Sequence, residues 1–511
     1  MVHILDRFEQ TVNNHPDKVA VKHGDEEITF IELKKASVRL GCDLVRNCSM
    51  GLINRPIAVF LPKEIDAITS DLAILYSGNA FMNLDVKTPS ERIGNIIEQI
   101  QPLAIITKNK YLKKLPNTET RLVLIEDVQA VSDDAIDGLL TMRCSIIDTD
   151  PFCIINTSGS TGTPKGVVLN QRSFFDFMVA SQEQFRFDGS EVLGSLSPIV
   201  FDIFDFELCM MVFYGSQIVL LDAKLAAFPA RLLQAMADAN VTFIFWVPSI
   251  MVNIANMGLL EKIDLPDLRL VWFAGEVFPT KQFLIWYDRF PDTVFANLYG
   301  PIEITLDCTF YVVEKRPLES EPLPIGRPYR NTDVLILNNM DELCGVGEPG
   351  ELCVRGTSLA MGYYNNSEKT GAAFTQNPLN SAYPETIYRT GDIVCRREDG
   401  NIMFKGRKDS LIKHMGYRIE LGEIEHVVEN DLKLVKYCCT VYNYEKKEIV
   451  MYYQNDDEIS DKDFRKALAN VFPSYMIPSV YMRMDELPRN INGKIDRLLL
   501  KETINKESLH E

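Results

Sequence analysis

Short apolar runs alternate with longer mixed segments along most of the chain. The runs have the length and composition of buried strands, and they read PIAVFL, LAIITK, RLVLIE, FCIIN, SQIVLLD, VTFIFWV and LRLVWFAG. Helix-length segments such as EIDAITSDLAILYSG and FPARLLQAMADAN lie between several of them. Strands that alternate with helices predict an α/β fold with mainly parallel sheets.

The pattern changes from about Asn331 onward. Shorter strands with Gly-rich turns, as in GEPGELCVRG and EDGNIMFKGRKD, predict a β-rich subdomain. After it, the amphipathic segments IELGEIEHVVE and DKDFRKALANVF predict a compact α+β unit. Because 511 residues exceed one ordinary core, we expect a large N-terminal domain over residues 1–408 and a small one over residues 409–511.

Composition narrows the classes of function. The net charge of −18 argues against a nucleic-acid partner, which would need a basic surface. The 11 cysteines lack paired CxxC spacing, so reduced thiols are the expectation. The N-terminal MVHILDRFEQ lacks the pattern of a signal peptide, and no apolar run approaches the ~20 residues needed to span a bilayer. We therefore expect a cytoplasmic protein without membrane insertion.

The segment NTSGSTGTPKGVVL follows directly on the strand-like FCIIN. Its glycines permit positive φ, so that successive N–H groups can converge on one anion, and Lys165 adds a positive charge. It is not a Walker loop, because Lys165 is followed by Gly166 and not by Ser or Thr. The residues alone leave two readings open, a phosphate-binding loop and a flexible surface loop.

Further motifs favour the first reading. TSGSTGTPKG resembles the phosphate loop of the adenylate-forming superfamily, which includes acyl-CoA synthetases, luciferases and amino-acid adenylation domains. Four more segments match elements of that family in the family's order: NLYGPIEIT, YRTGD, GRKDSLIKHMGYRIELGEIE and PRNINGKIDR. Because the matches are ordered and span nearly the whole chain, the protein is identified as a member of this superfamily.

The resemblance implies ATP and Mg²⁺ as cofactors. Tyr299 would stack on adenine, Asp392 would accept hydrogen bonds from the ribose hydroxyls, and Glu303 would hold Mg²⁺. The complete set of residues expected to bind the nucleotide is Thr157, Ser158, Gly159, Ser160, Thr161, Gly162, Lys165, Asn297, Tyr299, Gly300, Asp392 and Arg407.

The C-terminal motifs imply the remaining machinery. Lys494, in NGKIDR, would be the catalytic residue, because its ammonium can neutralise the charge that develops between a carboxylate and the α-phosphate. Asp409 matches the hinge about which the C-terminal domain rotates after adenylation. Gly416 would then let a pantetheine thiol pass close to the backbone.

VFDIFDFEL indicates the kind of acid that is activated. In amino-acid adenylation domains, an Asp at the position of Asp202 binds the substrate ammonium, and an enzyme for fatty acids has no use for a buried carboxylate there. The pocket expected from the motifs consists of Asp202, Ile203, Phe206, Phe245, Trp272, Ala274, Leu298, Leu306 and Asp307. Its three large aromatic residues predict a small amino acid.

The whole-chain pattern is most similar to the stand-alone D-alanine–carrier-protein ligases. Those enzymes usually carry Cys at the position of Ala274 and an apolar residue at that of Asp307. Asp307 would suit a polar substrate such as serine, or it is a local cap that points away from the pocket. D-alanine and a small polar amino acid therefore both remain open.

The expected reaction is ATP-dependent formation of an aminoacyl-AMP, followed by transfer to a carrier protein's phosphopantetheine thiol. Only 14 residues follow Arg497, far fewer than the ~80 of a carrier domain. We therefore expect the carrier to be a separate chain. Two alternatives remain, an acyl- or aryl-CoA ligase that uses free CoA and a nucleotide-binding module that no longer catalyses.

Overall fold

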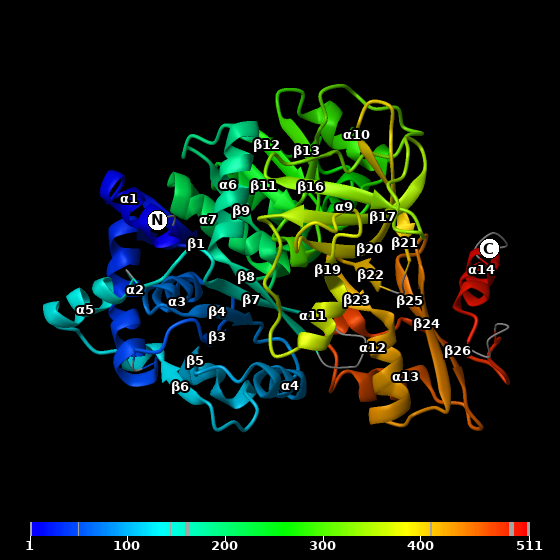
Figure 1. Ribbon diagram of the computed structural model, residues 1–511, viewed down its shortest axis with the longest axis horizontal. Coiled ribbons are helices and arrows are strands. Elements are labelled where there is room, and N and C mark those ends of the chain that lie inside the picture. Colours follow the sequence, from blue (N-terminus) through cyan, green and yellow to red (C-terminus); the bar gives the residue numbers. More distant parts are fainter. Residues whose placement is uncertain are drawn as a thin grey trace.

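The computed structural model describes residues 3–49, 51–143, 145–158, 164–408, 411–489 and 495–507. Two large sheets with helices between and around them form most of the molecule, which confirms the predicted α/β class (Figure 1). Elements from the C-terminal part of the chain, β24, β25 and α14, lie at the end of the molecule opposite to α1 and α2 (Figure 1).

The larger sheet has nine strands in the described residues, in the order β15-β14-β13-β12-β11-β9-β10-β1-β2. Its strands are β1 (Val19–His23), β2 (Glu26–Thr29), β9 (Val192–Ser195), β10 (Gln217–Leu220), β11 (Phe243–Trp246), β12 (Leu270–Phe273), β13 (Val294–Tyr299), β14 (Thr309–Val312) and β15 (Arg327–Pro328). The six central strands β1, β10, β9, β11, β12 and β13 pair in parallel with their neighbours in this order. At one edge β2 pairs antiparallel with β1, and at the other β14 and β15 continue the sheet antiparallel to β13.

The second large sheet follows the order β18-β8-β7-β4-β3-β5-β6. Its strands are β3 (Pro56–Phe60), β4 (Ala80–Leu84), β5 (Ala104–Thr107), β6 (Arg121–Leu124), β7 (Pro151–Thr157), β8 (Lys165–Asn170) and β18 (Gly362–Tyr363). Its central strands are also parallel, as expected for strands that read as continuous apolar runs.

Smaller sheets form the rest of the β structure. They contain β16 (Thr332–Leu337), β17 (Pro349–Gly356), β19 (Phe374–Gln376), β20 (Thr386–Arg396) and β21 (Ile402–Arg407); the hairpin β22 (Leu411–His414) and β23 (Tyr417–Glu420); and β24 (Tyr437–Asn443), β25 (Glu448–Gln454) and β26 (Val480–Arg483). The sequence-based domain boundary falls at Asp409, outside the described residues, and it remains a prediction.

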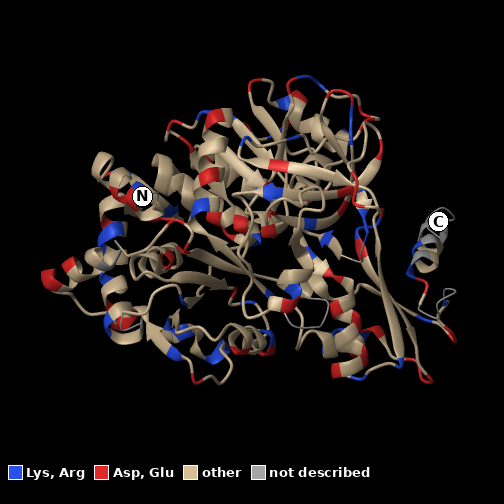
Figure 2. Cartoon of the chain, viewed as in Figure 1, with Lys and Arg blue, Asp and Glu red and all other residues tan. Residues whose placement is uncertain are grey.

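The α-helices of the described residues are α1 (Ile4–Asn14), α2 (Phe30–Leu44), α3 (Ile65–Tyr76), α4 (Ser90–Ile100), α5 (Asp133–Arg143), α6 (Gln171–Phe185), α7 (Asp202–Tyr214), α8 (Pro229–Asp238), α9 (Pro248–Asn256), α10 (Thr280–Arg289), α11 (Ser367–Ala373), α12 (Leu421–His426), α13 (Asp461–Leu468) and α14 (Arg497–Glu507). None of these helices has the length and apolar character that a membrane span requires. Lys and Arg are interspersed with Asp and Glu across the molecule (Figure 2).

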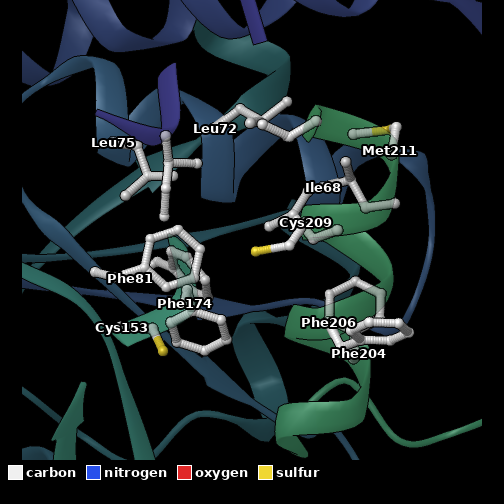
Figure 3. Close-up of a cluster of buried hydrophobic side chains, with 14 of the residues drawn as sticks. Ile68, Leu72, Leu75, Phe81, Cys153, Phe174, Phe204, Phe206, Cys209 and Met211 are labelled. Atoms are coloured by element: carbon white, nitrogen blue, oxygen red, sulfur yellow. The ribbon is translucent and has the colours of Figure 1, made fainter. Parts of the chain in front are cut away.

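Helix α7 is buried along most of its length. Its sequence is apolar on every side, and each residue from Ile203 to Val212 is buried. One large core joins it to α3, α6 and both sheets, and Figure 3 shows Phe204, Phe206 and Cys209 of α7 facing side chains from these elements. A helix that is apolar all round is stable only when it is enclosed, so α7 occupies the layer between the sheets.

Candidate functional site

A cleft lies where the parallel strands of both large sheets end. Its walls include residues that directly follow or terminate β4, β7, β11, β12 and β13. Ligands of open α/β sheets bind outside the carboxyl ends of the strands, because loops of differing chemistry meet there. The first turn of α7, with Asp202 and Ile203, forms another part of the wall.

The hairpin β22–β23 closes this cleft. Lys413 and Arg418 are directly opposite in the hairpin register, so they lie on one face, and Glu420 shares that face because it is two residues further on. Ile412 and Ile419 form the other face and pack into the core of the three-stranded C-terminal sheet. The hairpin therefore presents its charged face to the N-terminal sheets and its apolar face to the C-terminal core.

Two ion pairs join the hairpin to residues that the sequence assigns to the nucleotide. Glu420 Oε1 lies 2.8 Å from Nζ of Lys165, and an Arg418 guanidinium nitrogen lies 2.6 Å from Oε2 of Glu303. Ser158 adds two hydrogen bonds: its hydroxyl donates to the Arg418 carbonyl at 2.7 Å and accepts from the Glu420 N–H at 3.1 Å. The hairpin thus engages three side chains of the predicted nucleotide site.

Further contacts fix the hairpin and the following helix. The Gly416 N–H donates to Glu276 Oε1 at 2.8 Å, and the other oxygen of Glu276 accepts from the Ser249 N–H at 2.9 Å. Arg92 of α4 pairs with Glu423 of α12 at 2.5 Å, and both side chains are largely buried. Gly416 has φ +82°, and a Cβ there would lie 2.8 Å from Val247, so a larger residue would not fit.

Glu303 is fully buried. Burial opposes its ionised form, but Arg418 beside it outweighs burial, and the pKa of Glu303 lies below its usual value. Its other oxygen accepts a hydrogen bond from the Tyr363 hydroxyl at 2.9 Å. Glu303 is therefore an ionised carboxylate held in place on both oxygens.

Asp392 is another residue of the cleft wall. It accepts hydrogen bonds from the Tyr299 hydroxyl and from the Arg407 guanidinium, and Arg407 also donates to the Thr390 carbonyl at 3.0 Å. Burial and the negative charge of Asp392 raise the pKa of Tyr299. The nucleotide residues predicted from separate motifs, Tyr299, Asp392 and Arg407, are thus in direct contact.

Two carboxylates and one ammonium group share the part of the cleft next to α7. Burial raises the pKa of Asp202 to about 6. Burial and the charge of Asp202 raise the pKa of Asp307 well above its usual value. Lys413 enters from the hairpin, and burial lowers its pKa although Asp392 and Asp307 oppose that shift. Asp307 lines the cleft, which does not fit the reading of it as a cap that points away.

The predicted substrate residues divide into two groups. Six form part of the cleft wall: Asp202, Ile203, Phe245, Ala274, Leu306 and Asp307. Phe206, Trp272 and Leu298 are buried behind that wall, and the rings of Phe206 and Trp272 stack with centroids 5.0 Å apart. Phe245 therefore lines the wall, and Phe206 and Trp272 pack behind it, each with its ring centroid 5.5 Å from that of Phe245. Asn297 is also buried, and its side-chain amide donates to the Pro324 carbonyl at 2.7 Å.

Several predicted residues lie outside the described part of the chain: Gly159, Ser160, Thr161, Gly162, Asp409 and Lys494. The described residues nearest to Lys494, Arg489 and Ile495, pair with each other. Ile495 packs with Cys439 of β24, whereas the neighbouring Cys438 belongs to the core that holds the hairpin residues Ile412 and Ile419. Since successive strand residues point to opposite faces, Ile495 lies on the sheet face opposite to the hairpin.

Comparison with known proteins agrees with this geometry. The profile of the family described as AMP-binding enzyme matches residues 8–364. The chain belongs to the AMP-binding enzyme family. It is 32% identical over 502 residues to gramicidin S synthase 2 of Aneurinibacillus migulanus, covering 98% of this chain and 11% of that protein. It is 29% identical to zwittermicin A synthase ZmaJ of Bacillus cereus, covering 96% of this chain and 93% of that protein.

Solved structures share the fold of this AMP-binding enzyme. The adenylation domain AlmE of Vibrio cholerae, in complex with glycyl-adenosine-5'-phosphate, superposes with a TM-score of 0.84 at 20% identity, covering 99% of this chain and 98% of that one. An o-succinylbenzoate CoA synthetase of Bacillus subtilis gives a TM-score of 0.82, also at 20% identity, covering 97% and 98%. At this identity the likeness concerns the fold alone.

The residues of the enzyme fit a magnesium nucleotide in one respect. No group of three or more His, Cys, Asp or Glu side chains among the described residues could hold a metal ion. Mg²⁺ in nucleotide enzymes is usually held by one or two carboxylates together with phosphate oxygens, and Glu303 offers one ionised carboxylate. In this arrangement the Arg418 guanidinium is paired with Oε2 of Glu303. A metal ion could therefore bind that oxygen only after Arg418 has moved away.

Sequence reasoning missed the functional face of the hairpin. The segment from Gly406 to Glu425 drew attention to Arg407, Asp409 and Gly416, but not to Lys413, Arg418 or Glu420. A signal was present, because LIKH and YRIE alternate apolar and charged residues with the two-residue period of a half-buried strand. The identity of their partners depends on contacts across more than a hundred residues of sequence.

The ion pair between Lys165 and Glu420 generates a prediction. In Glu420→Gln, Lys165 no longer has a competing carboxylate, so ATP should bind up to about five-fold more tightly, equivalent to ~1 kcal/mol for a mostly buried pair. Titration calorimetry with ATP measures this change. The exposed Glu458→Gln on the same part of the chain should leave the Kd for ATP unchanged. Unchanged or weaker binding in Glu420→Gln would contradict competition between the hairpin and ATP.

Proposed function

We propose that this enzyme activates an amino acid as aminoacyl-AMP and transfers it to the phosphopantetheine thiol of a separate carrier protein. The observation that carries the proposal is Asp202, a carboxylate in the cleft wall that lies in the same part of the cleft as a second carboxylate, Asp307. The ammonium of Lys413 acts on both of them and on Asp392. A zwitterionic substrate would add a second cation beside Asp202, whereas a carboxylic acid without an amine would add only negative charge.

The expected chemistry of the first step follows from charge. The carboxylate of the substrate and the α-phosphate of ATP repel each other, so the site must supply cations and oriented donors. The loop from Thr157 to Lys165 would hold the leaving pyrophosphate, Mg²⁺ at Glu303 would neutralise phosphate charge, and Lys494 would act between the two reacting anions. This assignment requires the C-terminal part to rotate, because the hairpin engages Lys165 and Glu303 in the present arrangement.

The present arrangement suits the second step. Once pyrophosphate has left, the carboxylate of Glu420 can pair with Lys165, and Arg418 can pair with Glu303. Lys413 then lies beside Asp392 and Tyr299, its ammonium 5.8 Å from the ring of Tyr299, where it can offset the charge of a departing AMP. Gly416, which lines the cleft without a side chain, would border the path of the thiol.

The relatives in sequence, gramicidin S synthase 2 and zwittermicin A synthase ZmaJ, are synthases. The solved structures share the fold with this chain, and they include both an adenylation domain seen with glycyl-adenosine-5'-phosphate and a CoA synthetase, so the choice between the two readings rests on Asp202. The chain spans about a tenth of gramicidin S synthase 2, so neither the substrates nor the partners of that whole protein carry over directly. Localisation in the cytoplasm remains our expectation from the sequence.

Asp307 favours a small polar substrate over D-alanine. Its buried carboxyl lines the same cleft as Asp202, and burial and the charge of Asp202 raise its pKa. A substrate hydroxyl or amine would give this carboxyl a hydrogen-bond partner in the cleft, which the methyl group of alanine would not. Phe245 in the wall, backed by Phe206 and Trp272, would limit the length of the substrate side chain.

ATP–pyrophosphate exchange with a panel of D- and L-amino acids tests the proposal. We expect exchange with a small amino acid, and more with serine than with alanine because only the serine hydroxyl can bond to Asp307. The matched control for each substrate is its analogue without the amine, which should give no exchange. Exchange with carboxylic acids that lack an amine, but with no amino acid, would instead support an acyl- or aryl-CoA ligase. No exchange with any acid would support a non-catalytic nucleotide-binding module.

The elevated pKa of Asp202 predicts a pH dependence. Burial raises this pKa to about 6, so the carboxylate takes up a proton as the pH falls through that value and no longer attracts an ammonium group. Hence kcat/KM for the amino acid should fall about ten-fold per pH unit below pH 6, while KM for ATP does not follow the same step. Asp202→Asn should remove this inflection. An inflection at the ordinary Asp pKa would contradict the role of the buried Asp202.

The role of Lys494 predicts that its removal affects adenylate formation but not ATP binding. Lys494→Ala should abolish exchange, because the charge between carboxylate and α-phosphate is no longer neutralised, and it should leave ATP binding largely intact. The exposed Lys462→Ala in α13 is the control and should retain full exchange. Full exchange in Lys494→Ala would refute the assigned role.

A further inference from the structure

A second cluster of charged groups lies behind the cleft, outside the nucleotide and substrate residues. It consists of Lys63, Ser195 and Glu207. Lys63 follows β3 of the seven-stranded sheet, Ser195 ends β9 of the nine-stranded sheet, and Glu207 belongs to α7. Three elements from both sheets and the helix layer therefore meet at one point.

The contacts within this cluster are specific. The Lys63 ammonium donates to the Ser195 carbonyl at 2.7 Å and to the Ser197 carbonyl at 3.0 Å, and it lies 3.3 Å from the Ser195 hydroxyl. That hydroxyl is hydrogen-bonded to Glu207. Ser195 and Glu207 are almost completely inaccessible to solvent. Charge-assisted bonds of this kind, removed from water, hold backbone groups more firmly than neutral ones.

The backbone that Lys63 holds leads directly into the cleft. The connection from Ser195 to Asp202 carries Val200 and Phe201, which line the cleft together with Asp202. Lys63 fixes the start of this connection at Ser195 and Ser197. Glu207 fixes its end, because it lies on α7 little more than one turn after Asp202.

We infer that Lys63, Ser195 and Glu207 form a positioning device for Asp202. The inference rests on the proposed function, in which Asp202 binds the substrate ammonium. The contacts of these three residues set the distance between the carboxyl end of β9 and the first turn of α7. That distance determines where the Asp202 carboxylate lies relative to the substrate ammonium. None of the three residues needs to contact the substrate for this role.

The pKa shifts within the cluster agree with this positioning role. Burial lowers the pKa of Lys63, and Glu207 and Asp222 oppose that shift while Lys87 adds to it. Burial raises the pKa of Glu207, and Lys63 and Ser195 oppose that shift. Loss of either charge therefore leaves the other buried with one compensating partner fewer, which destabilises this junction.

The test is Lys63→Met, which keeps most of the side-chain volume and removes the ammonium. KM for the amino acid in pyrophosphate exchange should rise about 10- to 100-fold, as for other small displacements of a binding group, while KM for ATP stays unchanged. The matched control is Lys108→Met. Lys108 is also partly buried and paired, with Glu64 and Asp66, and should leave both KM values unchanged.

A second readout does not depend on activity. Hydrogen–deuterium exchange of the backbone amides in residues 196–203 should accelerate in Lys63→Met and not in Lys108→Met. If Lys63→Met does not fold, Glu207→Gln serves instead, because the new amide can still bond to Ser195 while the charge is gone. Glu207→Gln should also raise KM for the amino acid.

The outcomes separate this inference from the proposed function. A wild-type enzyme without amino-acid exchange overturns the proposed function, and the amide exchange of residues 196–203 then still decides whether Lys63 holds the connection. In an active enzyme, an unchanged KM for the amino acid, or an equal rise of both KM values, overturns the positioning role. Unchanged amide exchange in residues 196–203 overturns it as well.

Discussion

The burial of α7 between the two large sheets is the constraint on which the site depends. Because the helix is largely apolar, it is stable in the layer that both sheets enclose. That position brings its first residue, Asp202, to the carboxyl ends of strands from both sheets, and it packs Phe206 against Phe245 of the cleft wall. Among the polar residues of this helix, Glu207 bonds to Ser195, whose backbone Lys63 holds in turn.

The hairpin β22–β23 adds a set of charges to this framework. Its Arg418 and Glu420 bond to Glu303 and Lys165. Under the proposed function, a magnesium nucleotide would need the same two side chains, so the hairpin and the nucleotide phosphates would compete for them. Such competition would let one cleft serve two successive steps, since departure of the phosphates would free the partners that stabilise the arrangement of the second step.

Much of the fold could be predicted from the chain. Apolar runs that alternate with helical segments predicted the parallel α/β sheets, and ordered motifs predicted a nucleotide site. Asp392, Tyr299 and Arg407 come from three separate motifs, and they are in direct contact. The pocket was predicted less completely, because a motif assigns Trp272 to the pocket but does not tell whether its ring lines the cleft. In the structure Trp272 is buried behind Phe245 and stacks on Phe206.

The fold class, the family and the chemical character of the site follow from the chain alone. Those properties depend on local periodicity and on residues close together in the chain, such as the glycines and Lys165 of one loop. Packing in three dimensions was needed to show that Glu420 pairs with Lys165, that Asp307 lines the cleft with Asp202, and that Lys63 holds the connection into α7. Each of these contacts joins residues far apart in sequence, and their pairing is set by how sheets, helix and hairpin pack together, which no local pattern specifies.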